Sequence, residues 1–179
     1  NLMLHPYASI QGVFDEPLDG YRGPHDSIWS QEFYETGKER DFVRGFTYET
    51  TRGRGVVATA LTGVHTGRIP WGAGHHDAYR KLFNRIAGVV AICEDLPEEH
   101  NTVTLDPNIK DAHGIPAPRM TYSISDNSQK MLDFAVARAS ETLRAAGATD
   151  LIIEQPLAGG GWHLMGTARM GTDPQKSVV

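Results

Sequence analysis

The sequence predicts an α+β fold built on a mainly antiparallel β-sheet that is backed by helices. Three observations support this. Strand-like segments follow one another along the chain, and helical periodicity appears in only some of the connections between them. The strand-like segments are rich in β-branched and aromatic residues and partly alternate with polar ones, as half-buried strands do. One long segment in the second half has the apolar spacing of an amphipathic helix.

The first half is expected to form strands joined by long irregular connections. Its strands are predicted at residues 8–14, 32–34 and 42–49. Residues 21–41 otherwise lack a clean period and are predicted to be loop. Glycines at intervals between residues 53 and 74 indicate a long irregular connection, which ends at a helix over residues 75–86.

The second half has clearer periodicity. Strands are predicted at residues 87–95, 101–106, 119–124 and 151–153, with turns at residues 106–108 and 114–118. The long helix begins after the capping residues 125–127. Its apolar positions recur at helical spacing from Met131 to Ala146, and Gly147 ends it.

Composition excludes several classes of protein. With 179 residues, the chain is long enough for one domain with a core. A net charge of −5 without any run of Lys or Arg excludes nucleic acid as a partner. The single cysteine, Cys93, rules out an internal disulfide framework and a cysteine-rich metal site. Because Cys93 lies in an apolar run, we expect a buried structural thiol.

No nucleotide-binding motif is present in the sequence. The triplet Gly159–Gly161 does not complete G-x-G-x-x-G, because Leu164 occupies the last glycine position. The first residues lack the charged and apolar regions of a signal peptide, so none is expected here, and no apolar run is long enough to cross a bilayer. Both ends look like cuts within a longer protein, and the localisation of that protein is left open.

Adjacent histidines were considered as metal ligands. His75, His76 and Asp77 are consecutive, and His65 lies shortly before them. Neighbouring helical residues do not face one another, so they seldom bind one ion together. We therefore expect a solvated helix start and no metal site. The alternative is a metal-dependent hydrolase built on these four residues, which tightly bound stoichiometric metal would support.

His163 has a different setting from the other histidines. It follows three glycines and Trp162, and it precedes the segment Gly166–Gly171. Glycines allow the backbone to approach another body closely, and a histidine held there suits a general base near neutral pH. The local sequence also leaves a structural role open. The histidines in turn-like or polar settings are expected at the surface or in loops: His5, His25, His100 and His113.

The segment from Trp162 to Gly171 reads W-H-L-M-G-T-A-R-M-G and continues as T-D-P-Q-K-S-V-V to Val179. It resembles the C-terminal active-site segment of the glucose-methanol-choline (GMC) oxidoreductases, whose pattern is H-x-x-G-T-x-x-M-G followed by D-P-x-x-S-V-V-D. Residues 101–107 and 111–116 and the end of the long helix resemble the substrate domain of the same family. Residues 1–6 resemble the point where the chain leaves the flavin domain.

The resemblance implies that residues 1–179 are a substrate-binding domain that ends within the active-site segment 161–179. Such a domain has an antiparallel sheet backed by helices, and a separate Rossmann-like domain, absent here, binds FAD. His163 would be the base that takes the hydroxyl proton while hydride passes to flavin N5. By the same resemblance, Gly166 and Thr167 would contact the cofactor and Trp162 the substrate. The second catalytic His or Asn would lie beyond Val179.

The implied activity is oxidation of CH–OH groups in an alcohol, sugar, polyol or sugar acid, with oxygen, quinone or a haem partner as the final acceptor. The sequence resembles the sugar and polyol dehydrogenases more than glucose oxidase. Residues 33–36 and 42–46 either line the substrate mouth or serve packing. Without its FAD domain the chain is expected to be colourless and inactive. The alternative is a stand-alone binding domain with the same fold and no redox activity.

Overall fold

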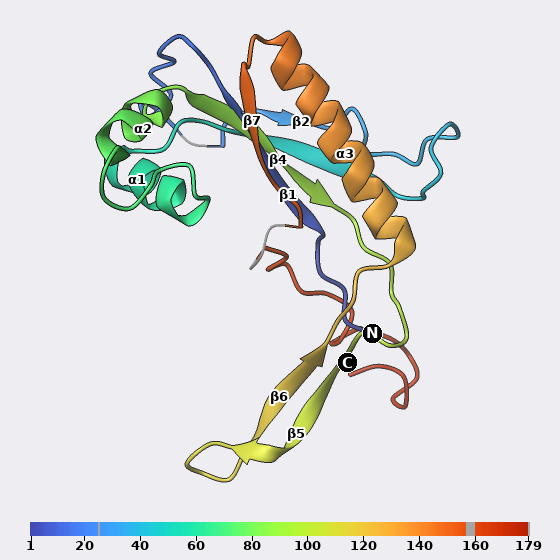
Figure 1. Ribbon diagram of the computed structural model, residues 1–179. Helices are drawn as coiled ribbons and strands as arrows, with labels where there is room; N and C mark the ends of the chain where they lie inside the picture. The colour runs from blue at the N-terminus through green and yellow to red at the C-terminus, as the bar shows by residue number, and fades with distance from the viewer. Residues whose placement is uncertain (25, 157–159, 179) are drawn as a thin grey trace.

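The computed structural model describes residues 1–24, 26–156 and 160–178. A five-stranded sheet has the strand order β2-β3-β4-β1-β7, and a separate hairpin pairs β5 with β6 (Figure 1). The sheet strands are β1 (Tyr7–Val13), β2 (Trp29–Ser30), β3 (Phe46–Thr51), β4 (Ile86–Cys93) and β7 (Asp150–Glu154). All neighbouring strands of the sheet pair antiparallel. The predicted α+β fold with a mainly antiparallel sheet is confirmed.

Helix α3 (Asp126–Ala145) packs on one face of the sheet, against β1, β4 and β7 (Figure 1). The Ser125 side chain accepts a hydrogen bond from the Ser128 N–H, which caps the start of the helix as predicted. The fully buried Met131 and Leu132 lie in one core cluster with Ala8 and Ile10 of β1. Burying a side chain of that size stabilises a fold by roughly 1.5–3 kcal/mol. Because side chains alternate along a strand, the opposite face of β1 presents Tyr7, Ser9 and Gln11.

The excursion between β3 and β4 contains two helices at one end of the sheet (Figure 1): α1 (Val56–His65) and α2 (His75–Leu82). Helix α1 was not predicted, because it lies in the glycine-containing stretch expected to be an irregular connection. The helix predicted over residues 75–86 is too long. The helix ends at Leu82 because Phe83 already has an extended backbone (φ −61°, ψ 130°); Asn84 follows with a positive φ of 62°, and Ile86 begins β4.

Two predicted strands in the first half are misplaced. Residues 32–34 are not a strand; the short strand of this region is β2, which starts three residues earlier, at Trp29. The strand predicted over residues 42–49 begins only at Phe46, because Arg44 has a left-handed backbone (φ 73°) that no regular strand contains. Phe33, Phe42 and Phe46 belong to the core beside Phe134 of α3, so here the packing alternative applies.

Strands β5 (Thr102–Lys110) and β6 (Pro116–Thr121) form a hairpin that projects away from the sheet (Figure 1). The turn predicted at residues 106–108 is a bulge within β5. The Asp106 carboxylate accepts the N–H groups of Asn108 and Ile109, and the register shifts between Leu105 and Lys110. Asp106 thus makes the side-chain hydrogen bonds typical of a turn, as predicted. The turn interrupts strand β5 but does not end it.

The buried position predicted for Cys93 is confirmed, since the residue is 1% exposed. Burial raises the pKa of its thiol. No helix in the described part of the chain combines the length and the apolar character that a bilayer crossing requires.

Candidate active site

The two ends of the chain meet beside the base of the hairpin (Figure 1). Met3 and Met165 form an isolated antiparallel bridge: the Met3 N–H donates to the Met165 carbonyl at 2.9 Å, and the Met165 N–H donates back at 3.0 Å. The Leu2 N–H donates to the Asn101 carbonyl at 2.7 Å. The segment that contains His163 is therefore fixed to the residues that lead into β1.

Buried polar side chains hold the segment before β1. Asn101, with no exposed surface, accepts the Ser123 N–H at 2.8 Å and donates to the Ser123 carbonyl at 3.1 Å. The Asp95 carboxylate accepts the Leu4 N–H at 3.2 Å and the Ser128 hydroxyl at 2.8 Å. Both side chains bond residues that are distant in sequence, and so a framework of hydrogen bonds from buried side chains surrounds the site.

Four aromatic rings gather where the ends meet, and we call them the aromatic cluster: His5, Tyr7, Trp162 and His163. The ring centroids of His5 and His163 are 4.5 Å apart, with an angle of 35° between the planes. Tyr7 lies 5.5 Å from His5 and 6.0 Å from Trp162. The structure thus brings together two of the four site residues predicted in the C-terminal segment, Trp162 and His163, and two residues from the start of the chain.

His5 corrects one part of the expectation for the histidines. It lies in the loop before β1, as one of the two expected settings has it, but it is not at the surface: it is 5% exposed, whereas His163 is exposed. Neither ring nitrogen of His5 has a hydrogen-bond partner among the described residues. Burial first, and the charge of His163 second, lower the pKa of His5 from its ordinary value of 6.5.

Two glycines allow the close approach of the segments. Gly161 has a φ of 89°, and a Cβ there would lie 3.3 Å from the carbonyl oxygen of His5. Gly166 has a φ of 86°, and a Cβ there would overlap the carbonyl oxygen of Asn1. Both positions require a left-handed backbone next to another chain segment, which glycine adopts without steric cost. Thr167, predicted with Gly166 to contact a cofactor, is exposed in the turn that follows.

A cavity of about 460 Å³ lies on the face of the sheet opposite α3 and reaches the aromatic cluster at Tyr7 and Trp162. Ser9, Gln11 and Glu49 line it from the strands. Its remaining polar lining includes Tyr21, Asp26, Thr51, Arg52 and Arg54. Apart from the aromatic residue Trp162, the sequence analysis identified none of this lining, because the residues come from separate strands and loops.

The charges of the cavity act on the hydroxyl of Tyr7. Burial raises the pKa of Tyr7; the negative charges of Glu49 and Asp26 raise it further, and Arg54 opposes them. Tyr7 is therefore a neutral hydroxyl near neutral pH. Arg52 has a buried Nε and a buried Nη1 without hydrogen-bond partners among the described residues. The cavity thus offers hydrogen-bond donors and acceptors in close proximity, next to aromatic rings.

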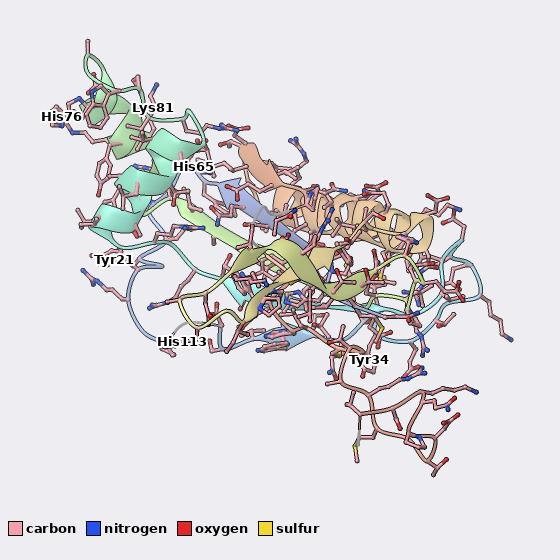
Figure 2. All side chains as sticks on the ribbon, turned by 90° about the horizontal axis from the view of Figure 1, so that it is seen from below. Tyr21, Tyr34, His65, His76, Lys81 and His113 are labelled. Atoms are coloured by element: carbon pink, nitrogen blue, oxygen red, sulfur yellow. The ribbon has the colours of Figure 1, made fainter. Side chains whose placement is uncertain are left out.

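The other sequence candidates lie elsewhere. Figure 2 shows His65 and His76 on the α1 and α2 end of the molecule, and His75 and Asp77 are exposed at the start of α2. Within residues 1–24, 26–156 and 160–178, no three His, Cys, Asp or Glu side chains are grouped as metal ligands. His113 is exposed in the loop of the β5-β6 hairpin. His25 and Gly159 are outside the described residues.

Comparison with known proteins connects this site to oxidoreductases. Residues 97–179 match the sequence model of a family described as GMC oxidoreductase. The chain is 39% identical to a 2-methyl-1,2-propanediol dehydrogenase from Mycolicibacterium austroafricanum, over 99% of this chain and 32% of that protein. Fructose dehydrogenase large subunit from Gluconobacter japonicus is 34% identical over 48% of this chain and 16% of its own length.

A paromamine 6'-oxidase from Streptomyces fradiae is 35% identical over 51% of this chain and 17% of its own length. The chain therefore spans about a third of the length of the propanediol dehydrogenase, and the matches to the other two relatives cover less than a fifth of theirs.

Proposed function

This chain belongs to the GMC oxidoreductases, and on that premise we propose that it forms the substrate-binding side of an FAD-dependent enzyme that oxidises CH–OH groups. The substrate is an alcohol, sugar, polyol or sugar acid, and His163 is the base that takes its hydroxyl proton. The observation that carries the proposal is the position of His163: it is exposed, its ring contacts His5, and it follows Trp162 at the rim of a polar cavity.

The cavity supports a hydroxylated substrate. Its lining contains two arginines and two carboxylates, so the formal charges balance and an uncharged ligand fits best: Asp26, Glu49, Arg52 and Arg54. Hydroxyl groups both donate and accept hydrogen bonds, which suits a lining of mixed donors and acceptors. The names of two relatives include a diol and a sugar, which agrees with this class.

The residues next to His163 are suited to FAD. Trp162, Leu164 and Met165 are each more than half exposed, although their side chains are large and apolar. A flat apolar ring system would cover such a surface, and we propose that Gly166 and Thr167 contact it from the following turn. When bound, FAD accepts the hydride from the carbinol carbon. His163 takes the hydroxyl proton, while Trp162 and Tyr7 orient the substrate beside it.

The test uses the full-length protein. We expect it to be yellow, and we expect His163→Ala to abolish flavin reduction by substrate while the FAD content stays unchanged. His113→Ala, which removes an exposed histidine from the hairpin, is the matched control and should reduce flavin at the wild-type rate. A full-length protein that bound no flavin would falsify the proposal, and so would a His163→Ala variant with wild-type flavin reduction.

A further inference from the structure

We propose that His5 is a positioning residue for His163: it supports the His163 ring with an uncharged imidazole and has to remain uncharged to do so. This inference rests on the proposed role of His163 as base. Its first support is the contact itself, in which the two ring centroids are 4.5 Å apart and the planes are tilted by only 35°. At that angle the two rings lie closer to a face-to-face than to an edge-on arrangement, so the His5 ring limits where the His163 ring can move.

The burial of His5 indicates its charge state. Its side chain is 5% exposed, and both ring nitrogens are buried without hydrogen-bond partners among the described residues. An imidazolium carries two N–H donors and a charge, whereas neutral imidazole carries one donor. A charged ring without acceptors would therefore be far less stable here than a neutral one.

The neighbouring titratable groups agree with a neutral ring. Those that lie around His5 are His163, Tyr7, Tyr122 and Asp95. The Asp95 carboxylate is bonded to the Leu4 N–H and to the Tyr122 hydroxyl, so it does not bind the His5 ring. Burial and the proximity of His163 lower the pKa of His5. With His5 neutral, His163 can take a proton from substrate without a positively charged His5 ring next to it.

The position of His5 is fixed independently of its side chain. The Met3–Met165 bridge lies on one side of it, and on the other side the Pro6 carbonyl accepts the Cys93 N–H at 2.9 Å. The close approach of Gly161 to the His5 carbonyl brings the C-terminal segment against the same residue. A backbone held at these points lets the His5 ring determine where the His163 ring lies.

The experiment measures flavin reduction by substrate in the full-length, FAD-loaded protein, as a function of substrate concentration and pH. We expect His5→Ala to lower the limiting rate by about tenfold or more, because His163 loses its support, with the half-saturating substrate concentration changed by less than about threefold. We expect His5→Phe, which keeps an uncharged ring, to restore the rate to within about threefold of wild type. His113→Phe is the matched control.

The pH profile separates positioning from a merely structural role. In the wild type, protonation of His5 places a positive charge against the His163 ring and removes activity, so kcat/KM should fall on the acid side. His5→Phe lacks this proton, so its acid-side fall should be less steep by one proton. A wild-type rate in His5→Ala overturns the proposal, as does an acid-side fall as steep as that of the wild type or an Ala-like rate in His5→Phe.

If His5→Ala does not fold, the rate of flavin reduction and the pH profile of His5→Phe test the proposal on their own. His163→Ala is measured in parallel. If His163→Ala loses flavin reduction while the His5 variants keep the wild-type rate, only this inference is overturned. If His163→Ala still reduces flavin, the proposed function is overturned.

Discussion

Met3 and Met165 exchange two backbone hydrogen bonds, at 2.9 and 3.0 Å, and so join the start of the chain to the segment of Trp162 and His163. A single bridge of this kind is too small to be stable alone. Its stability comes from the neighbouring contacts, namely the Leu2 N–H on the Asn101 carbonyl and the close approach of Gly166 to Asn1. The arrangement of the candidate active site therefore depends on residues that have no chemical role.

Gly166→Ala is expected to displace the C-terminal segment. The new Cβ would overlap the Asn1 carbonyl oxygen, and alanine disfavours the φ of 86° by about 1–2 kcal/mol. Gly114→Ala is the matched control, because Gly114 also has a positive φ (82°) but has open space around its Cβ. We expect Gly166→Ala to lose more stability in urea unfolding than Gly114→Ala, and to lose flavin reduction as well. Equal effects of the two substitutions would contradict the tight contact at Gly166.

Asn101→Ala is expected to be among the most destabilising substitutions near the site. It removes the two part-buried hydrogen bonds between the fully buried Asn101 side chain and the N–H and carbonyl of Ser123, each of which contributes about 0.5–1.5 kcal/mol. Asn108→Ala, at an exposed position of β5, should change the free energy of unfolding by less than about 0.5 kcal/mol. Urea unfolding followed by circular dichroism measures both variants. A loss below 1 kcal/mol in Asn101→Ala, by the same scale, would mean that water replaces the lost bonds.

The long helix and the central strands were predictable from the sequence because burial imposes a period on them. Helix α3 buries Met131, Leu132, Ala135 and Ala139 against the sheet, and this face is visible in the sequence. Helix α1 buries only Thr59 and Gly63, so it has no apolar period to detect. A Cβ at Gly63 would overlap Ile69; the glycine that argued against a helix is thus there for packing.

Half of the candidate site was accessible from sequence. His163 and Trp162 lie in a short motif with family-specific spacing, and the structure places them next to His5 and Tyr7 in the aromatic cluster. His5 precedes a proline and lies in no periodic segment, so its local sequence resembled a loop. Its burial results from contact with Gly161 and His163 at the other end of the chain, and no local pattern reports such a contact.

Cys93 is expected to resist thiol reagents in the folded protein. Its side chain is 1% exposed in the core beneath α3, and burial raises the pKa of the thiol, so the reactive thiolate is scarce near neutral pH. Labelling with a maleimide should be slow in buffer and fast in denaturant, where the single thiol is accessible. Rapid labelling without denaturant would show that this part of the sheet opens readily.

The stability of the protein is expected to depend on pH through His5. Because the pKa of His5 is lowered in the folded state from 6.5, the unfolded chain binds the proton more readily. The contribution of the neutral, buried imidazole is thus fully present above pH 6.5 and is lost as the pH falls from there towards the folded pKa. His5→Phe has no proton to bind at this position. Its free energy of unfolding, relative to wild type, should therefore rise as the pH is lowered from 7 to about 5. Urea unfolding across this range tests the sign, with His113→Phe as the control for loss of an exposed imidazole. If the difference in unfolding free energy between His5→Phe and wild type stayed constant with pH, His5 would bind protons equally in the folded and the unfolded state.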